Sequence, residues 1–503
     1  MPNITSLANE LLCIIFLNAI EDSPPKMAQH CSTEYPELLP FDAYHGRNPP
    51  TLRKAPLNPV VGVSKNSLIT PVTLSQVCKQ WQKVACEFPS LWSRIYVSDP
   101  TTKHVSLTRQ WLTRAGTRPL SLVLHHSDNP TSPGLEKVAE EILLLFGSRS
   151  SLWKHIDFRL TIGSIYLLDA IIFDKHQCPQ LKSAALSFLK AEPKHYRNIL
   201  NSAETEYLNL INAAEAVWKK IHGAGMLESI TWFATWTQSD FCSDTPWRSL
   251  TKLSIQTPLM LNRILSVLHR CKQLEVLLVA MLPTGVGLTG PHCDFALRVV
   301  ECSQLKTMHL YLMDRREGVS LLDHLTAPSL KQLSLTAGIG HPTPIRIYHI
   351  PLNMFPPKKV LQAFLSRSTS HLEQLRLQYY HHDRATVHQY LTEIREFRSL
   401  ITLEVFGDIS LDTFKHFTHR TSTGAHLIMP NLESLVLTRC KPEITKQRAL
   451  VVARSRWHTS PSGEEHRSPG SLRNIYVTPV QRHGTVSGMP GWRTPLLGTR
   501  DVC

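Results

Sequence analysis

The chain of 503 residues is too long for one ordinary globular domain, unless that domain is a repeat array that can grow without limit. Its hydrophobic fraction of 42% can supply a large core, which excludes disorder along the whole chain. The formal charge is +14, of which residues 441–503 supply +6; the rest is spread too thinly for a nucleic-acid-binding stripe, so we expect no specific nucleic-acid partner.

The cysteines and the apolar segments indicate where the protein resides. Eleven cysteines, an odd number without framework spacing, favour reduced thiols and an intracellular location, cytoplasmic and/or nuclear. The apolar run 11–17 has no basic residue before it and follows Glu10, which argues against a signal peptide. No apolar stretch reaches the roughly 18 residues of a membrane span. We therefore expect a soluble protein without a membrane partner.

Residues 3–20 are predicted to form a helix with an unusually wide apolar stripe. One face carries apolar residues at the helical period, namely Leu7, Leu11, Ile14 and Ile15. Leu12 and Phe16 widen that stripe beyond what one small neighbour would cover. Residues 23–71 then hold nine of the chain's 34 prolines, and this composition predicts a long disordered insert.

A second helix is predicted to follow the insert and to end at Phe88. Thr73 and Gln76 match a capping box at its start, and Pro89 excludes the helical conformation at the residue before it. Apolar residues recur at helical spacing along one face: Leu74, Val77, Cys78, Trp81, Val84, Ala85 and Phe88.

An internal repeat dominates the chain beyond this point. Apolar residues recur at offsets 0, 3 and 5 of a short run that resembles a strand, and the clear copies begin 24 to 42 residues apart. The clear copies are Leu250-Leu253-Ile255, Leu274-Leu277-Val279, Leu305-Met308-Leu310, Leu330-Leu333-Leu335, Leu372-Leu375-Leu377, Leu400-Leu403-Val405 and Leu432-Leu435-Leu437. The weaker copies are Pro119-Leu122-Leu124, Trp153-Ile156-Phe158, Leu181-Ala184-Leu186 and Leu227-Ile230-Trp232.

This repeat predicts an α/β fold. One strand and one helix or loop per unit cannot bury an apolar strand face alone, so stacked neighbours must share a continuous core. We therefore expect an irregular solenoid resembling leucine-rich repeats over residues 98–440. Residues 441–503 lose the pattern and are predicted to form a basic disordered tail.

The chain over residues 1–97, apart from its insert, resembles an F-box of the kind common in fungal proteins. The likeness rests on Leu7-Ala8-Asn9-Glu10-Leu11-Leu12, Val77-Cys78-Lys79-Gln80-Trp81 and Pro89-Ser90-Leu91-Trp92. The resemblance implies a small helical domain that completes its core against a Skp-type adaptor. The adaptor-binding residues that it implies are Leu7, Leu11, Leu12, Ile15, Phe16, Val77, Cys78, Trp81, Leu91 and Trp92.

An F-box followed by leucine-rich repeats resembles the substrate receptor of an SCF-type cullin–RING ubiquitin ligase. This implies binding to a cullin through the adaptor, binding of an unidentified target through the repeats, and protein ubiquitination without a catalytic residue in this chain. Ala8 replaces the family's usual proline and the insert is long, so the alternative is a non-ligase scaffold with a decayed F-box.

Two aromatic features have their own predicted roles. Trp92 begins a further 0-3-5 copy with Ile95 and Val97, and Ser90-Leu91-Trp92 recurs as Ser151-Leu152-Trp153, which predicts that the helices lead into the solenoid without a linker. Trp232, Trp236 and Trp247 are expected in a core more than on a binding surface.

The signals for an enzyme or a metal site are weak. Residues 285–290 match the G-x-G-x-x-G of dinucleotide-binding loops, but Pro291 would fall inside the helix that should begin there. We therefore favour a glycine-rich loop between repeats, with a nucleotide-binding enzyme as the remaining alternative. His125-His126 and His381-His382-Asp383 lack the further ligands of a metal site, so no metal, cofactor or catalytic residue is expected.

Overall fold

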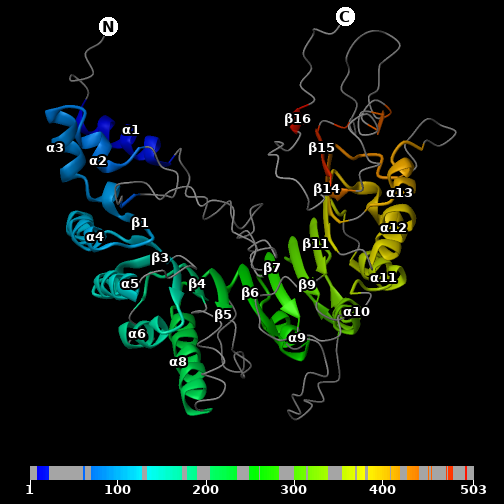
Figure 1. Cartoon of the computed structure of the whole chain (residues 1–503), viewed down its shortest axis with the longest axis horizontal. Helices are drawn as coiled ribbons and strands as arrows, with labels where there is room; N and C mark the ends of the chain where they lie inside the picture. The colour runs from blue at the N-terminus through cyan, green and yellow to red at the C-terminus, as the bar shows by residue number, and fades with distance from the viewer. Residues whose placement is uncertain are drawn as a thin grey trace, which may run out of the picture. The chain divides into compact units, whose positions relative to one another are not determined.

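A computed structural model of the chain divides into two compact units, Met1–Leu250 and Thr251–Cys503 (Figure 1). The structure describes residues 8–21, 61–62, 69–126, 133–172, 178–189, 204–234, 249–259, 261–281, 299–312, 315–337, 354–368, 371–379, 383–407, 409–419, 428–440, 451–452, 455, 472, 474–479 and 493–495. No helix within these ranges is long and apolar enough to cross a membrane.

Unit 1 begins with short helical segments and continues as alternating strands and helices. The helical segments are α1 (Asn9–Glu21), α2 (Pro71–Ser75), α3 (Lys79–Glu87) and the 3-10 helix η3 (Pro89–Trp92). The alternating part comprises β1 (Arg94–Ser98), α4 (Thr102–Ala115), β2 (Leu120–His125), α5 (Pro133–Gly147), η4 (Ser150–Leu152), β3 (Trp153–Thr161), α6 (Ser164–Ile171), β4 (Ser183–Leu189), α8 (Glu204–His222) and β5 (Ser229–Ala234).

Unit 2 continues the same alternation. Its elements are β6 (Lys252–Leu259), α9 (Leu261–Arg270), β7 (Val276–Met281), β8 (Val300–Glu301), β9 (Thr307–Leu312), α10 (Arg315–Asp323), β10 (Leu325–Thr326), β11 (Gln332–Ala337), α11 (Lys358–Ser368), β12 (Gln374–Gln378), α12 (Arg384–Glu393), η7 (Arg395–Ser399), β13 (Thr402–Phe406), α13 (Leu411–His416), β14 (Ser434–Cys440), β15 (Asn474–Pro479) and β16 (Arg493–Pro495).

Each unit is an α/β repeat array built on a parallel sheet. In unit 1 the strands pair in the order β1-β2-β3-β4-β5, all parallel. In unit 2 the order is β6-β7-β9-β11-β12-β13-β14-β15, also parallel, and β16 pairs antiparallel with β15. Within each unit the helices lie on one side of the sheet (Figure 1). The other side of the sheet, called here the open face, carries polar side chains such as Ser121 and His125 as well as apolar ones such as Val123 and Leu278.

The 0-3-5 pattern predicts the strands and their register. In unit 2 the residues at offset 3 are register partners from strand to strand and are nearly inaccessible: Leu253, Leu277, Met308, Leu333, Leu375, Leu403, Leu435 and Ile475. In unit 1 the same row is Ile95, Leu122, Ile156, Ala184 and Ile230. Each strand thus buries its apolar side chains against those of the next repeat.

The second predicted helix is in fact two helices. α2 ends at Ser75, and Cys78 is the extended N-cap residue of α3, where its Sγ accepts a hydrogen bond from the Trp81 backbone N–H at 3.5 Å. The capping box joins Thr70 and Thr73, with the Thr73 N–H donating to Thr70 Oγ1 at 3.2 Å, and does not involve Gln76. The predicted start was wrong because two hydroxyl residues three apart compete for the same helix end.

Two short stretches expected to be disordered are ordered. Val61 and Gly62, within the predicted insert, lie against the free edge of β1, where Gly62 forms an antiparallel bridge with Tyr96. In the predicted tail, β15 pairs with β14, and Leu472 and Ile475 are buried. The strand obeys the 0-3-5 rule through Leu472, Ile475 and Val477, so the repeats extend beyond residue 440. Most other residues of both segments lie outside the described ranges.

Cysteines have a repeated structural place that sequence reasoning did not identify. Cys178, Cys271 and Cys302 each stand three residues before the first leucine of a repeat, whose N–H donates to the cysteine carbonyl at 3.1 to 3.3 Å. All three are buried, and none of the six cysteines whose side chains the structure describes is in a disulfide bond. Burial raises the pKa of Cys178 to about 12 and is the main cause that raises the pKa of Cys302 to about 11.

The new strand can be tested by hydrogen exchange. We expect Leu472→Ala to destabilise the end of unit 2 by about 2–5 kcal/mol, because it removes a buried leucine and leaves a cavity. Backbone amides of β14 and β15 should then exchange faster, whereas Asn474→Ala, a change at an exposed side chain of the same strand, should leave them protected. Equal protection in both variants would show that Leu472 does not hold β15 on the sheet.

The buried thiols predict selective labelling. Because the thiolate is the reactive species and burial raises the pKa of Cys178 and Cys302, both should resist maleimide at pH 8 in the native protein and react once it is denatured. Cys86, which is only half-buried, should react before Cys178 and Cys302. Mass spectrometry of the labelled peptides measures the order, and labelling of Cys178 at the rate of Cys86 would contradict the burial.

Candidate interaction surface

The N-terminal helices of unit 1 share a small core of their own. α1 buries one stripe, Leu12, Phe16 and Ile20, at the spacing of successive helical turns. The Phe16 ring packs edge-on against Trp81 of α3, with ring centroids 4.8 Å apart and an interplanar angle of 61°. Gln80 Nε2 donates to Asn9 Oδ1 at 3.5 Å, which adds a polar contact between α1 and α3. These contacts fix which face of α1 turns inward.

The other face of α1 is apolar and open to solvent. Leu11, Ile14 and Ile15 are 50%, 55% and 45% exposed. Because they lie three and four residues apart, they form one continuous patch along a single helical turn. We call these three residues the α1 patch.

Further apolar side chains are exposed on the other N-terminal helical segments. Ile69 and Val72 lie at the start of α2, and Val77 lies in the turn between α2 and α3. Of the twelve large hydrophobic residues that are exposed within the described ranges, these three and the α1 patch make up half. Scattered exposed apolar residues are ordinary, whereas a contiguous exposed apolar patch is typical of an interaction site, so the N-terminal helices are a candidate for one.

The predicted adaptor-binding residues divide into a buried and an accessible group. Leu12, Phe16, Leu91 and Trp92 are buried within unit 1, so their side chains support the surface and do not form it. Leu11, Ile15 and Val77 are exposed, and Cys78 and Trp81 are half-buried. Leu7 lies outside the described residues. Ile69 and Val72 were not predicted, because the sequence placed the first in the disordered insert and the second outside any helix.

Trp81 brings an indole N–H group into this region. Its indole nitrogen is inaccessible to solvent and has no hydrogen-bond acceptor among the described residues. A buried, unbonded N–H costs free energy, so tryptophan is used here for its ring, which packs against Phe16.

Trp92 closes the end of α3. Its Nε1–H donates to the carbonyl of Ala85 at 2.7 Å. That carbonyl would ordinarily accept from residue 89, but Pro89 has no N–H, so the indole takes its place. The ring also packs edge-on against Trp111 at 5.1 Å, with the Arg114 guanidinium 4.3 Å from its centroid. Trp92 therefore joins the N-terminal helices to the first repeat.

The second Ser-Leu-Trp sequence forms the same kind of hydrogen bond two repeats later. Trp153 Nε1 donates to the Phe146 carbonyl at 3.0 Å, again seven residues earlier in the chain. Phe158 packs against both rings, edge-on with Trp153 and stacked with Phe146. The repeated Ser-Leu-Trp sequence thus ends a helix in the same way at both places, just before a strand.

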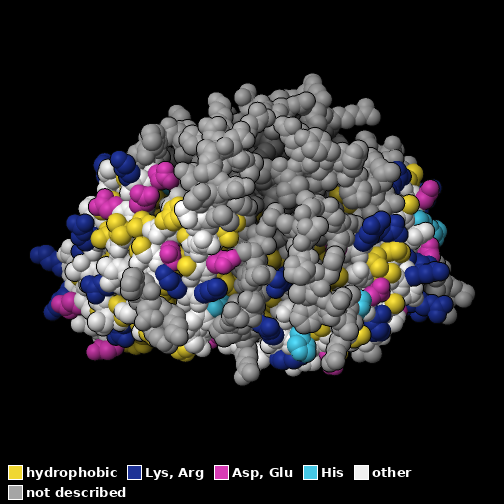
Figure 2. Space-filling model, turned by 90° about the horizontal axis from the view of Figure 1, so that it is seen from below, with side chains coloured by type: hydrophobic (Ala, Val, Ile, Leu, Met, Phe, Trp, Pro, Cys, Tyr) yellow, Lys and Arg dark blue, Asp and Glu magenta, His cyan; other side chains and the backbone are white. Residues whose placement is uncertain are grey.

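The open faces of the two sheets carry polar clusters. In unit 1, His125 Nε2 lies 3.1 Å from Asp157 Oδ2, and the His125 ring packs edge-on against Tyr96. In unit 2, Arg376 lies 3.6 Å from Glu404 and 4.3 Å above the Phe406 ring. These clusters make the two open faces candidate recognition surfaces. On the side of the molecule seen in Figure 2, basic and acidic side chains are interspersed.

The remaining predicted features are structural or lie outside the described residues. Trp232 is buried in the core, whereas Trp236, Trp247 and the glycine motif at 285–290 fall outside the described ranges. The Asp383 carboxylate accepts hydrogen bonds from the backbone N–H groups of Met354 and Phe355, which is a structural role. No group of three or more potential metal ligands occurs among the residues that the structure describes.

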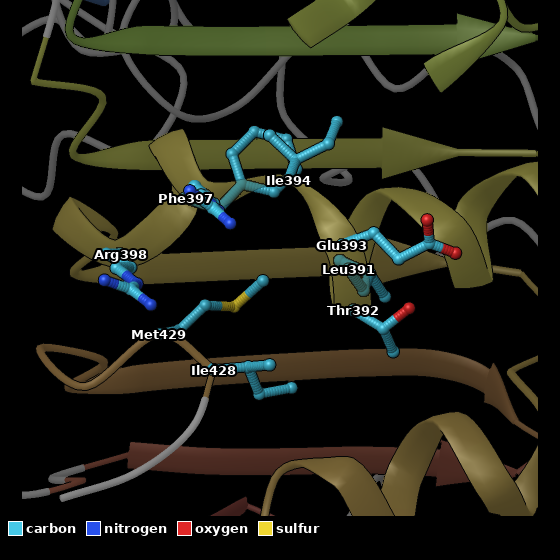
Figure 3. Close-up of a pocket in the computed structure, with 9 residues that line it drawn as sticks. Leu391, Thr392, Glu393, Ile394, Phe397, Arg398, Ile428 and Met429 are labelled. Atoms are coloured by element: carbon cyan, nitrogen blue, oxygen red, sulfur yellow. The ribbon is translucent and has the colours of Figure 1, made fainter. Parts of the chain in front are cut away.

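A cavity of about 210 Å³ lies in unit 2 between α12, η7 and the residues before β14 (Figure 3). Its apolar walls include Phe397 and Met429, and Arg398 stands at its rim. Glu393, also at the rim, is paired with Lys358 of α11. The lining includes none of the predicted site residues, so the cavity is separate from the N-terminal surface.

Comparisons with known proteins do not assign the chain to a family. No protein-family profile matches it, and no curated protein is detectably similar to it in sequence. Among solved structures, it is similar to the crystal structure of a protein from Bacteroides fragilis, at 12% identity and a TM-score of 0.31, over 63% of this chain and 81% of that one.

Substitution should affect stability strongly at the buried Trp92 and weakly at the exposed Ile14. Trp92→Phe should destabilise unit 1 by about 1–3 kcal/mol, because it leaves the buried Ala85 carbonyl without a donor. Ile14→Ser, at an exposed position of α1, should change stability by less than about 0.5 kcal/mol. Thermal unfolding of the two variants beside the parent protein measures the difference. A stable Trp92→Phe variant would refute the capping role.

Proposed function

We propose that this protein is the substrate-recognition adaptor of an SCF-type cullin–RING ubiquitin ligase. In this proposal the N-terminal helices bind a Skp-type adaptor, and the repeats bind a target protein. The α1 patch is the observation that carries the proposal, because it leaves an apolar helix face open beside a core that is already filled. The fit of residues 77–92 to the F-box pattern supports the same partner.

In this proposal the chain holds a target close to an enzyme and catalyses no reaction itself. A target held by the repeats would be kept near a ubiquitin-conjugating enzyme bound elsewhere in the ligase, which raises the effective concentration of its lysines. Such a role requires one surface for the adaptor and another for the target, and it requires no catalytic group. The polar open faces of the two sheets would supply the target-binding surface.

Binding to a purified Skp-type adaptor tests the first half of the proposal. The variant with both Leu11→Asp and Ile15→Asp should bind at least about thirtyfold more weakly than the parent chain, because the loss of even one apolar interface anchor costs about 2 kcal/mol or more. The matched control carries Leu144→Asp and Met226→Asp, two equally exposed apolar residues outside the N-terminal helices. Titration calorimetry on the full chain measures both.

The outcomes separate the ligase from its alternative. Equal adaptor affinity of both variants, or no binding by the parent chain, would refute docking through α1. If the adaptor binds but no cullin joins the complex, the protein is a scaffold outside a ligase, and the ubiquitination part of the proposal fails.

A further inference from the structure

The cavity of unit 2 between α12 and η7 combines buried apolar walls with a basic rim (Figure 3). Arg395 and Arg398, both on η7 and both exposed, stand at its opening. An apolar hollow with a few polar groups at one side is the usual form of a small-molecule site. The buried side chains that form its walls are Leu391, Ile394, Phe397, Ile428 and Met429.

The acidic side chains near the opening are already engaged elsewhere. Glu393 at the rim is paired with Lys358 of α11, and Glu396 on η7 accepts a hydrogen bond from Ser366 Oγ of α11 at 2.6 Å. Among the residues that the structure describes, no carboxylate forms an ion pair with either rim arginine. The opening therefore presents two positive charges that this part of the protein does not neutralise.

Met429 is held in the cavity wall in a strained backbone conformation. Its φ is 47°, in the left-handed region, although Pro430 favours extended backbone at the residue before it. The Leu432 N–H donates to the Met429 carbonyl at 3.1 Å, and Asn431 Nδ2 donates to the Arg398 carbonyl at 3.3 Å. These bonds fix the turn against η7. Strained residues concentrate at ligand sites, and this one places a flexible thioether in the wall.

We propose that this cavity binds a small monocarboxylic acid with an aliphatic body, of the class of medium-chain fatty acids. The walls are aliphatic apart from Phe397, and a guanidinium binds a carboxylate through two parallel hydrogen bonds. An apolar cavity of about 150 Å³ accommodates benzene, so about 210 Å³ suits a body of about eight carbons. The inference does not depend on the ligase proposal, because the cavity contains no residue of the N-terminal helices.

Titration of the full chain with sodium octanoate at neutral pH, followed by NMR of ¹³C-labelled methionine methyl groups, tests the proposal. Octanoate should shift the Met429 signal, which the Met429→Leu variant assigns by its absence. Its Kd should be at least about tenfold lower than that of 1-octanol, because the alcohol carries no charge to pair with a guanidinium. Arg398→Gln should remove most of this difference. The matched control is Arg118→Gln, at an exposed arginine of unit 1, which should leave both Kd values unchanged.

Three results would overturn the proposal. If 1-octanol binds as tightly as octanoate, or if Arg398→Gln and Arg118→Gln have the same effect, the rim does not recognise a carboxylate. If acetate binds as tightly as octanoate, the apolar walls contribute nothing. If octanoate binds without moving the Met429 signal, or loses its affinity in the variant with both Leu11→Asp and Ile15→Asp, it binds outside the cavity. Thermal unfolding of Arg398→Gln should match that of the parent chain, because the side chain is exposed, so weaker binding would not reflect unfolding.

Discussion

The repeats of each unit depend on one constraint: a strand with one apolar side cannot bury it without the next repeat. Hydrogen bonds enforce the same stacking, because the Glu373 carbonyl accepts from the N–H groups of Ile401 and Thr402, at 2.8 and 3.0 Å, and the Ile401 carbonyl accepts from the next repeat in the same way. An array of this kind needs a cover at each end. Gly62 pairs with the free edge of β1, and β16 pairs with β15, both antiparallel to the strands they cover.

The sequence predicts the strands well because this constraint acts on residue type. Offsets 0, 3 and 5 must be apolar in every repeat, so a simple pattern gives strand positions and register together. Leu472-Ile475-Val477 obeys the rule but was not predicted as a strand, because it follows a long stretch rich in Arg, Ser and Pro. The recurring cysteine three residues before the first leucine is visible in the sequence as a spacing. The spacing does not show that its side chain is buried, which the structure shows for Cys178, Cys271 and Cys302.

The interaction surface was less predictable because it depends on tertiary contacts. Periodicity showed that α1 has more apolar residues than one neighbour needs. It could not show that Phe16 would turn toward Trp81 while Ile15, its neighbour in sequence, stays in solvent. The sequence assigned Trp92 to the start of a repeat, but it could not show the contact of its ring with Trp111, nineteen residues further along the chain. The position of a side chain cannot be predicted from a local pattern when it depends on a residue far away in the sequence.

The indole bond of Trp92 has a consequence for modularity. A domain joined to the rest of a protein by a flexible linker can be replaced by another domain, and a partner bound to it has no fixed orientation. Here the junction is formed by the buried rings of Trp92 and Trp111, with the Arg114 guanidinium over the Trp92 ring, so the N-terminal helices pack directly on α4 of the first repeat. A partner on α1 would be held at a set angle to the first repeats. Any graft of these helices onto another protein would therefore have to include α4, well beyond the point where the sequence pattern ends.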